Sequence, residues 1–430
     1  MKSRSGLWGN ADFMRLWIAQ AVSAFGSRIT RTALPIIAVA TLGESERVVA
    51  LLASVSLAPA AVLALFAGGF VDRGKKRRIL VLADAIRAVA IISLTIAWAC
   101  GVLSIVHVCV VGATVGAASA LFQIADIAYL PALVARADLV EGNAKLQTTD
   151  AFAEISGPAS AGVLIAVLGA PLAVVIDAVS YVWSAVMLGR IEKPEPPAAA
   201  ELPAMSMSAS MWQTTKDLRV GMRAVFGNLL VRPIAIASII WNASYGFFAA
   251  LYTLFCLRTL GLSQSTFGII IAMGGVGSII GAFAARPLAR VLGLGRTILV
   301  SAIIIVAIGA CIPLAGGPVA VAIGLLCVHQ LVGDGMSVVF NIHTVTLRQT
   351  VLPHGVLGRA NAAITACTSG VTPIAAILAG VIAEATSIRV AIWIGMALPV
   401  AVPFVLWPLR RIRQLPSTEL ADQPAGDTIR

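Results

Sequence analysis

Ionisable side chains lie inside stretches of this chain that are otherwise apolar. Arg28 and Arg31 are three residues apart in the first stretch, and Asp84 and Arg87 repeat that spacing in the third, so each pair shares one helical face. An ionised group in the middle of a bilayer costs about 2.5–3.5 kcal/mol on insertion scales, so it needs a partner or a water-filled cavity. We expect Asp84 and Arg87 to pair with each other, and the two arginines to favour an anionic or carbonyl-rich ligand.

Four acids in these stretches are candidates for binding and releasing protons. The first is Glu154, about 12 Å from the start of its helix at 1.5 Å per residue, where loss of water favours the neutral carboxyl. A fixed ion pair between Glu154 and an arginine of the first stretch is an alternative that stays open. Asp150, one turn earlier, Asp177 and Asp334 are the other three candidates.

An aromatic stripe follows one face of the seventh apolar stretch. Trp241, Tyr245, Phe248 and Tyr252 are spaced by four, three and four residues, and Asn242 lies beside them. Such a stripe can bind a flat or lipophilic molecule by stacking, or it can pack against other helices and lipid. Both interpretations stay open, although the hydroxyl and amide groups favour a cavity because they need polar partners.

The composition places these groups in a membrane. Of 430 residues 59% are hydrophobic and 12% are charged, which leaves too little polar surface to cover a soluble globule. A spanning helix needs about 20 apolar residues, and the runs do not alternate as the strands of a membrane barrel do. The sequence therefore predicts an all-α membrane protein with twelve transmembrane helices. The apolar runs are 13–42, 48–70, 79–101, 104–133, 146–168, 171–190, 233–258, 264–286, 297–316, 318–345, 360–384 and 387–409.

The net charge of +11 is concentrated on every second connection between the runs. By the positive-inside rule these connections and both termini lie in the cytoplasm. We therefore expect a multi-pass protein of the bacterial inner membrane that does not bind nucleic acid. The six cysteines and four histidines have no metal-ligand spacing, so we expect no metal and no cofactor.

Two sets of matching residues indicate that the chain consists of two similar halves. The segment GGFVDRGKKRR at 68–78 has a shorter counterpart, GAFAAR, at 281–286, and four residues within 139–162 match four within 357–380 at a constant offset. Parallel six-helix repeats are typical of transporters, with the substrate site between the halves. The predicted parts are an N-terminal six-helix bundle at 1–190, a cytoplasmic linker with an interfacial helix at 191–232, a C-terminal six-helix bundle at 233–409 and a cytoplasmic tail at 410–430.

Other classes of function are less compatible with the residues. The sequence contains no HExxH, no GxSxG and no pair of acids beside a histidine, so we do not expect an enzyme. An importer of a small organic solute with the same architecture remains an alternative, because a fold does not fix the direction of transport. A receptor that does not transport is a third possibility.

The chain resembles the major facilitator superfamily, in the branch that exports drugs, macrolides and siderophores. Six segments in the same order carry the resemblance: FMRLWIAQAVSAFGSRITRTALP at 13–35, GGFVDRGKKRR at 68–78, GPASAG at 157–162, DAVSYVWSA at 177–185, VGMRAVFGNLLVRP at 220–233 and TLRQTVLPHGVLGRANA at 346–362. The resemblance implies proton-driven efflux of an amphipathic antibiotic, natural product or siderophore, as an antiporter that can confer antibiotic resistance. The implied partners are a small-molecule substrate, protons and membrane lipid, and the implied state is a monomer.

The resemblance also implies gating residues. They are Gly68, Asp72, Arg73, Lys76, Arg77, Gly157, Pro158, Gly162 and Arg359. Asp72 is expected to act as a latch between the halves, because its negative charge would meet unsatisfied N–H groups at the start of the eleventh crossing. A solvated charge in a basic turn is the alternative. Gly157 and Pro158 are expected to bend the fifth crossing.

Overall fold

The structure is a computed structural model that describes residues 6–135, 138–195 and 207–412. The side chains of some residues within the helices, among them those of Asp72 and Glu154, lie outside this description. All regular elements in the described ranges are helices, which agrees with the all-α fold predicted from the sequence.

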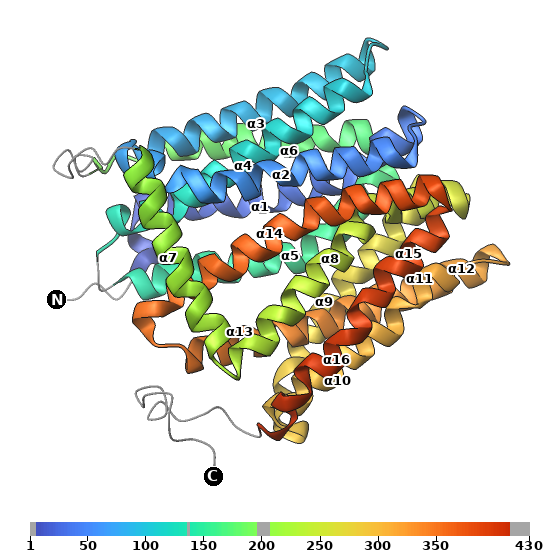
Figure 1. Ribbon diagram of the computed structural model, residues 1–430. Coiled ribbons are helices and arrows are strands. Elements are labelled where there is room, and N and C mark those ends of the chain that lie inside the picture. The colour runs from blue at the N-terminus through green and yellow to red at the C-terminus, as the bar shows by residue number, and fades with distance from the viewer. Residues whose placement is uncertain (1–5, 136–137, 196–206, 413–430) are drawn as a thin grey trace. The chain divides into compact units, whose positions relative to one another are not determined.

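Six long helices account for the first part of the chain (Figure 1, blue to green). They are α1 Ala11–Ile36, α2 Glu46–Arg73, α3 Lys76–Ala99, α4 Ile105–Leu133, α5 Leu139–Leu168 and α6 Ala170–Gly189. A short 3-10 helix, η1 Gly6–Gly9, precedes α1, and a π-helix, η2 Ile37–Thr41, continues it. Helix α6 packs against α1 and α3, α2 packs against α4, and α1 also packs against α5.

The second part of the chain begins with α7 Met207–Gly227 and continues as a series of helices, several of them interrupted. These are α8 Val231–Leu254 with η4 Phe255–Thr259, α9 Gln264–Leu292, α10 Leu294–Gly309 with α11 Cys311–Leu314, α12 Val319–Val328 with η5 His329–Asp334 and α13 Gly335–Val351, α14 His354–Ala385, and α15 Ile388–Ala397 with η6 Leu398–Ala401, α16 Val402–Leu406 and η7 Trp407–Arg411. Elements η4 and η5 are π-helices.

The chain divides into two compact units. Unit 1 comprises Met1–Ser210 and Ala249–Ala272, and unit 2 comprises Met211–Phe248 and Met273–Arg430. Unit 1 thus contains the last part of α8 and the first part of α9 in addition to α1 to α6. The contiguous domains at 1–190, 191–232, 233–409 and 410–430 stay a prediction.

Nine helical segments within the described residues are long and apolar enough to cross a membrane. Helices α1, α2 and α5, at 26, 28 and 30 residues, are outside that set, although each coincides with an apolar run of the sequence. The count of twelve crossings therefore stays a prediction.

Local sequence explains several helix boundaries. Asn10 caps α1, because its side-chain oxygen accepts the backbone N–H groups of Asp12 and Phe13, each at 3.1 Å. Gly169 and Gly293 have φ values of 79° and 82° and directly precede α6 and α10. Only glycine adopts this conformation without strain, so these two positions make the tight helix-to-helix turns.

Helix α7 contains the amphipathic segment that the sequence predicts within the linker. Its Val225 is fully buried in a cluster with residues of α14, and its Arg219 and Arg223 are exposed. A β-carbon at Gly221 would overlap the carbonyl group of Arg359, so α7 touches the backbone of α14. The apolar face of α7 therefore packs on protein, within unit 2.

Candidate functional site

A polar group of side chains is buried in the helical core of unit 1. Arg87 of α3 donates a hydrogen bond to Asp84 one turn earlier, and the two are 4% and 0% exposed. The guanidinium of Arg87 also lies over the rings of Phe122 and Tyr181, 4.5 and 4.2 Å from their centroids. The ion pair expected from the sequence is confirmed, and the aromatic contacts explain how the charge is accommodated.

Asp177 of α6 is fully buried beside this pair. Thr30 of α1 donates a hydrogen bond to its Oδ2, and Ser180 donates to its Oδ1 at 3.2 Å. A β-carbon at Gly26 would overlap both Ser180 and the Asp177 carboxyl, so the backbone of α1 closes over the acid. The structure therefore brings Asp177 together with hydroxyl groups from two helices.

Two further polar contacts extend this core. Gln20 of α1 donates a hydrogen bond to Asp126 of α4, and the hydroxyl groups of Ser27 and Tyr181 are 3.0 Å apart. Asp84, Asp126 and Asp177 thus come from three different helices of unit 1.

The first and fifth crossings meet where Arg28 lies against Gly157. A β-carbon at position 157 would overlap the Cγ of Arg28 and would lie 2.9 Å from its Cβ. Arg28 is half-buried, whereas Arg31 and Asp150 are exposed. The side chains of Glu154 and Pro158 lie outside the described residues, so their proposed roles stay predictions.

Gly162, the last residue of the GPASAG segment, touches the backbone of α9. A β-carbon at Gly162 would overlap the carbonyl oxygen of Gly268, and one at Gly268 would overlap that of Gly162. Both residues belong to unit 1. The two helices approach so closely there that neither position can hold a larger residue without a backbone shift.

The predicted aromatic stripe is divided by its surroundings. In unit 2, Trp241 packs on Phe340 with 4.8 Å between ring centroids, whereas Tyr245 is 45% exposed and stacks on Phe248 at 6.1 Å. In unit 1, Tyr252 is 3% exposed and contacts Phe267. The exposed ring of the stripe is therefore Tyr245, and Phe248, on which it stacks, is half-buried.

Polar groups lie near this pair in unit 2. Asn242 donates to the Ser238 carbonyl oxygen at 2.8 Å, and the Thr372 hydroxyl group of α14 donates to the Asn242 side-chain oxygen at 3.4 Å. Phe248 contacts the ring of His329, with 6.4 Å between centroids. His329 in turn contacts the Ile308 carbonyl oxygen at 3.3 Å through Nδ1.

Asp334 ends the π-helix that His329 begins. A β-carbon at Gly274 of α9 would overlap Oδ2 of Asp334 and would lie 3.1 Å from Nε2 of Gln330. Gly274 thus makes room for a carboxyl and an amide from the widened turn. Single π-turns interrupt the regular hydrogen bonding of a helix and are frequent at functional sites.

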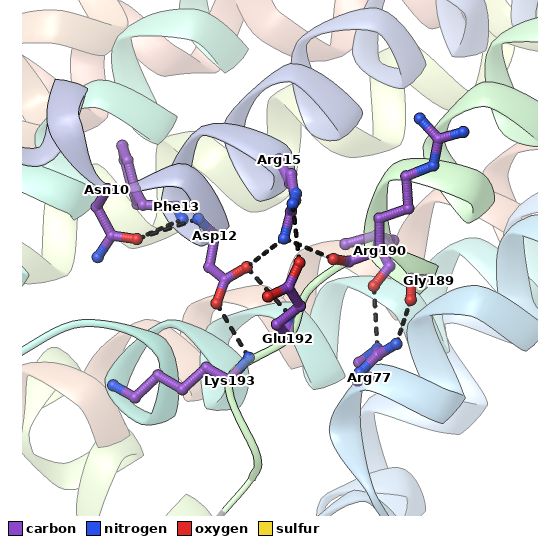
Figure 2. Close-up of polar contacts among 10 residues, drawn as sticks. Asn10, Asp12, Phe13, Arg15, Arg77, Gly189, Arg190, Glu192 and Lys193 are labelled. Atoms are coloured by element: carbon purple, nitrogen blue, oxygen red, sulfur yellow. Dashed lines mark hydrogen bonds and ion pairs between the residues drawn. The ribbon is translucent and has the colours of Figure 1, made fainter.

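The basic loop motif lies at the end of the bundle where α1 and α3 begin and α6 ends. Residues 190–195, which follow α6, are bound to three helices there, and Figure 2 shows the contacts with α1. Arg77 donates to the Leu188 and Gly189 carbonyl oxygens at the end of α6, and Arg15 donates to that of Arg190 at 2.6 Å. This set of contacts joins the loop motif to the start of the linker.

Two carboxylates hold the same segment. Glu195 accepts the backbone N–H groups of Lys76 and Arg77 at 2.8 Å each, so its negative charge lies at the N-terminus of α3. Asp12 accepts the N–H groups of Glu192 and Lys193 at 3.1 and 3.0 Å. Burial raises the pKa of the Asp12 carboxyl, but these N–H groups and Arg15 lower it more, so the pKa lies below its ordinary value.

The remaining gating candidates are only partly described. The surroundings of Gly68 and the side chains of Asp72 and Arg73 lie outside the description, so the latch at Asp72 stays a prediction. Arg359 is exposed on α14. Lys76 takes part in the network through its backbone, as the first residue of α3.

The sequence does not identify Thr30, Gln20 or Glu195 as residues of the site, because their partners are far away in the chain. Thr30 and Asp177 are 147 positions apart, and Gln20 and Asp126 are 106 apart. Glu195 lies in the predicted linker at 191–232, and nothing in the sequence connects it with the start of α3. The sequence shows only that Gln20 and Thr30 are polar residues in an apolar run. Many serines in the chain share this property, so it does not identify these two as functional. In the described part of the chain no group of three or more metal-ligating side chains occurs.

The sequence is similar to those of known transport proteins. The enterobactin exporter EntS of Citrobacter koseri is 26% identical over 371 residues, which cover 84% of this chain and 85% of the exporter. EntS of Salmonella typhimurium is 26% identical over 361 residues, which cover 82% and 83%.

Solved structures show a similar fold. The nucleoside transporter NupG matches with a TM-score of 0.68 and 17% identity over 93% of this chain and 99% of its own. A bacterial homologue of the iron transporter ferroportin, in its inward-facing state, matches with a TM-score of 0.67 and 16% identity over 93% and 98%. Residues 16–369 match the Major Facilitator Superfamily, and because that match extends over most of the sequence, the chain belongs to this family of membrane transporters.

Proposed function

We propose that the protein exports an amphipathic small molecule of the siderophore, antibiotic or natural-product class across the bacterial inner membrane, driven by the proton gradient. The observation that carries the proposal is the exposed ring of Tyr245 in unit 2, which stacks on the half-buried ring of Phe248. Aromatic rings that remain exposed in an otherwise packed helix can stack on a flat or lipophilic molecule.

The surroundings of the ring pair support an amphipathic substrate. Asn242 supplies an amide group and Thr372 a hydroxyl group in the same unit. Phe248 contacts His329, which is the first residue of the π-helix that ends at Asp334. Rings combined with a few polar groups bind a ligand by stacking and fix its orientation by hydrogen bonds. Arg28 and Arg31, on α1 of unit 1, are separate candidates for contact with an anionic or carbonyl-rich substrate.

The direction of transport and its energy source also belong to this proposal. The two EntS relatives are named as exporters, which supports efflux at 26% identity. Asp177, which is buried in α6, supports proton coupling, and Glu154, Asp334 and Asp150 are the other candidates. We expect alternating access by a monomer with both termini in the cytoplasm.

Transport into inverted membrane vesicles tests the proposal. Vesicles from cells that make the protein should accumulate added enterobactin when respiration acidifies their interior, and a protonophore should abolish the accumulation. Vesicles without the protein are the control. Accumulation in right-side-out vesicles would show an importer, for which uridine is a second probe, and no transport of enterobactin, ethidium or uridine would contradict a transport role for these compounds.

A further inference from the structure

Among the described residues, the core between α1, α3 and α6 contains more acids than cations. Asp84 and Asp177 are both 0% exposed, and Arg87, the cation described beside them, is hydrogen-bonded to Asp84. Among the described residues, Asp177 forms no ion pair and has only hydroxyl groups as side-chain partners. If all three groups were ionised, this buried core would keep one uncompensated negative charge.

That charge is costly. Removing a carboxylate from water costs several kcal/mol, and only a close cation or a full set of hydrogen bonds offsets it. Binding a proton removes the cost. The groups that face Asp177 fit both the ionised and the protonated form of its carboxyl. The hydroxyl groups of Thr30 and Ser180 can rotate, so they can donate to a carboxylate or accept from a carboxylic acid.

A second observation points to the same core. Oδ2 of Asp84 and Oγ of Ser184 are buried and lie near each other, and neither atom makes a hydrogen bond of regular geometry among the described residues. Ser184 lies on α6, two turns after Asp177, and is 0% exposed. Buried polar atoms are nearly always satisfied, so a proton or a water shared between the Asp84 carboxyl and the Ser184 hydroxyl group would satisfy both.

The charged and titratable surroundings of Asp177 are few. Helix α3 contributes Asp84 and Arg87, α6 contributes Tyr181, and α1 contributes hydroxyl groups and the backbone at Gly26. On α5, which also packs on α6, Asp150 is exposed, and the side chain of Glu154 lies outside the described residues.

Access to the Asp177 carboxyl depends on how closely α1 and α6 approach each other. At Gly26 the backbone of α1 leaves no room even for a β-carbon between the two helices. Separation of α1 from α6 would therefore open a path for water to the carboxyl. This geometry ties the exchange of a proton to a movement of the helices, as alternating access requires.

We propose that Asp177 is the proton-binding group of the N-terminal six helices, and that it exchanges its proton with water when α1 separates from α6. A hydronium ion on one side of the membrane gives its proton to the carboxylate and leaves as water, and water on the other side takes the proton back. The proposal deepens the proton-driven transport proposed above and selects one of its four candidate acids.

Infrared difference spectroscopy of the purified protein tests proton binding without any substrate. Acidification should produce the C=O stretching band of a buried carboxylic acid, and Asp177→Asn should lack the part of this band that exchanges slowly in heavy water. Glu384→Gln, which changes an exposed acid to its amide, is the matched control and should keep it. An unchanged band in Asp177→Asn, or a band lost in Asp126→Asn instead, would overturn the assignment.

Reconstituted vesicles test coupling separately. For enterobactin, Asp177→Asn should keep exchange between equal concentrations on both sides while losing accumulation driven by a pH gradient. If Asp177→Asn loses both exchange and the folded state, that result indicates a structural role for Asp177. The variants at its partner Thr30 then test the coupling: Thr30→Ser keeps the hydroxyl group and should keep accumulation driven by a pH gradient, whereas Thr30→Val should lose it. If the wild-type protein moves no enterobactin, the proposed substrate fails, whereas the infrared result still decides whether Asp177 binds a proton.

Discussion

Gly157 of α5 lies directly against the side chain of Arg28 of α1. A β-carbon at position 157 would overlap the Cγ of Arg28. The first glycine of the GPASAG segment therefore makes room for an arginine that crosses from the neighbouring helix. This contact adds a packing role to the helix bend that the sequence suggests at this point.

Gly157→Ala should force Arg28 out of its present position. Overpacking of this kind costs about 1–3 kcal/mol of folding free energy, and a displaced arginine should also lower transport. Thermal unfolding of the purified protein and vesicle uptake of enterobactin measure the two effects. Gly324→Ala is the control, because a β-carbon there meets nothing within 4 Å, and an equal loss in both variants would contradict this role for Gly157.

Gly162→Ala should separate α5 from α9. The neighbouring atoms at this position belong to the backbone of Gly268, which cannot rotate away as a side chain can. We expect a larger fall in unfolding temperature than for Gly157→Ala and a loss of transport. Gly370→Ala on α14, where the space is open, should unfold like the wild type. A stable and active Gly162→Ala variant would show that the close contact is dispensable.

Tyr245→Ala and Tyr252→Ala should separate ligand binding from packing. Tyr245 is 45% exposed, so its removal should weaken binding of enterobactin, followed by tryptophan fluorescence, with little change in stability. Tyr252 is 3% exposed against Phe267, so its removal should lower the free energy of unfolding by about 3–5 kcal/mol, as for other large aromatic side chains. Unaltered affinity in Tyr245→Ala would assign that ring to packing or lipid contact.

The contribution of Asp12 to stability should depend on pH. Its pKa is lower in the folded protein than its ordinary value of 3.8, so the ionised form stabilises the fold above about pH 4. This stabilisation is lost as the pH falls through the lowered pKa. Asp12→Asn should therefore unfold at a lower temperature than the wild type at neutral pH, and the difference should shrink in acid. Thermal scans at several pH values measure it, and a difference that does not vary with pH would contradict the ionic role.

The sequence by itself determined the helical class, the positions of the helices and the close pair of Asp84 and Arg87. Run length and residue spacing suffice for these features, because an apolar run of given length forms a spanning helix and residues three apart meet on its surface. The amphipathic helix α7 was predictable for the same reason. Residue spacing alone also places Trp241, Tyr245, Phe248 and Tyr252 on one face of their helix.

Only the tertiary structure decided what each face contacts. It placed Thr30 against Asp177, put the carboxylate of Glu195 at the start of α3, and divided the aromatic stripe into buried and exposed rings. Helix periodicity fixes which residues share a face, but it contains no information on the neighbouring helix. The partners of a buried acid come from distant parts of the chain, so its chemistry follows from packing and not from spacing.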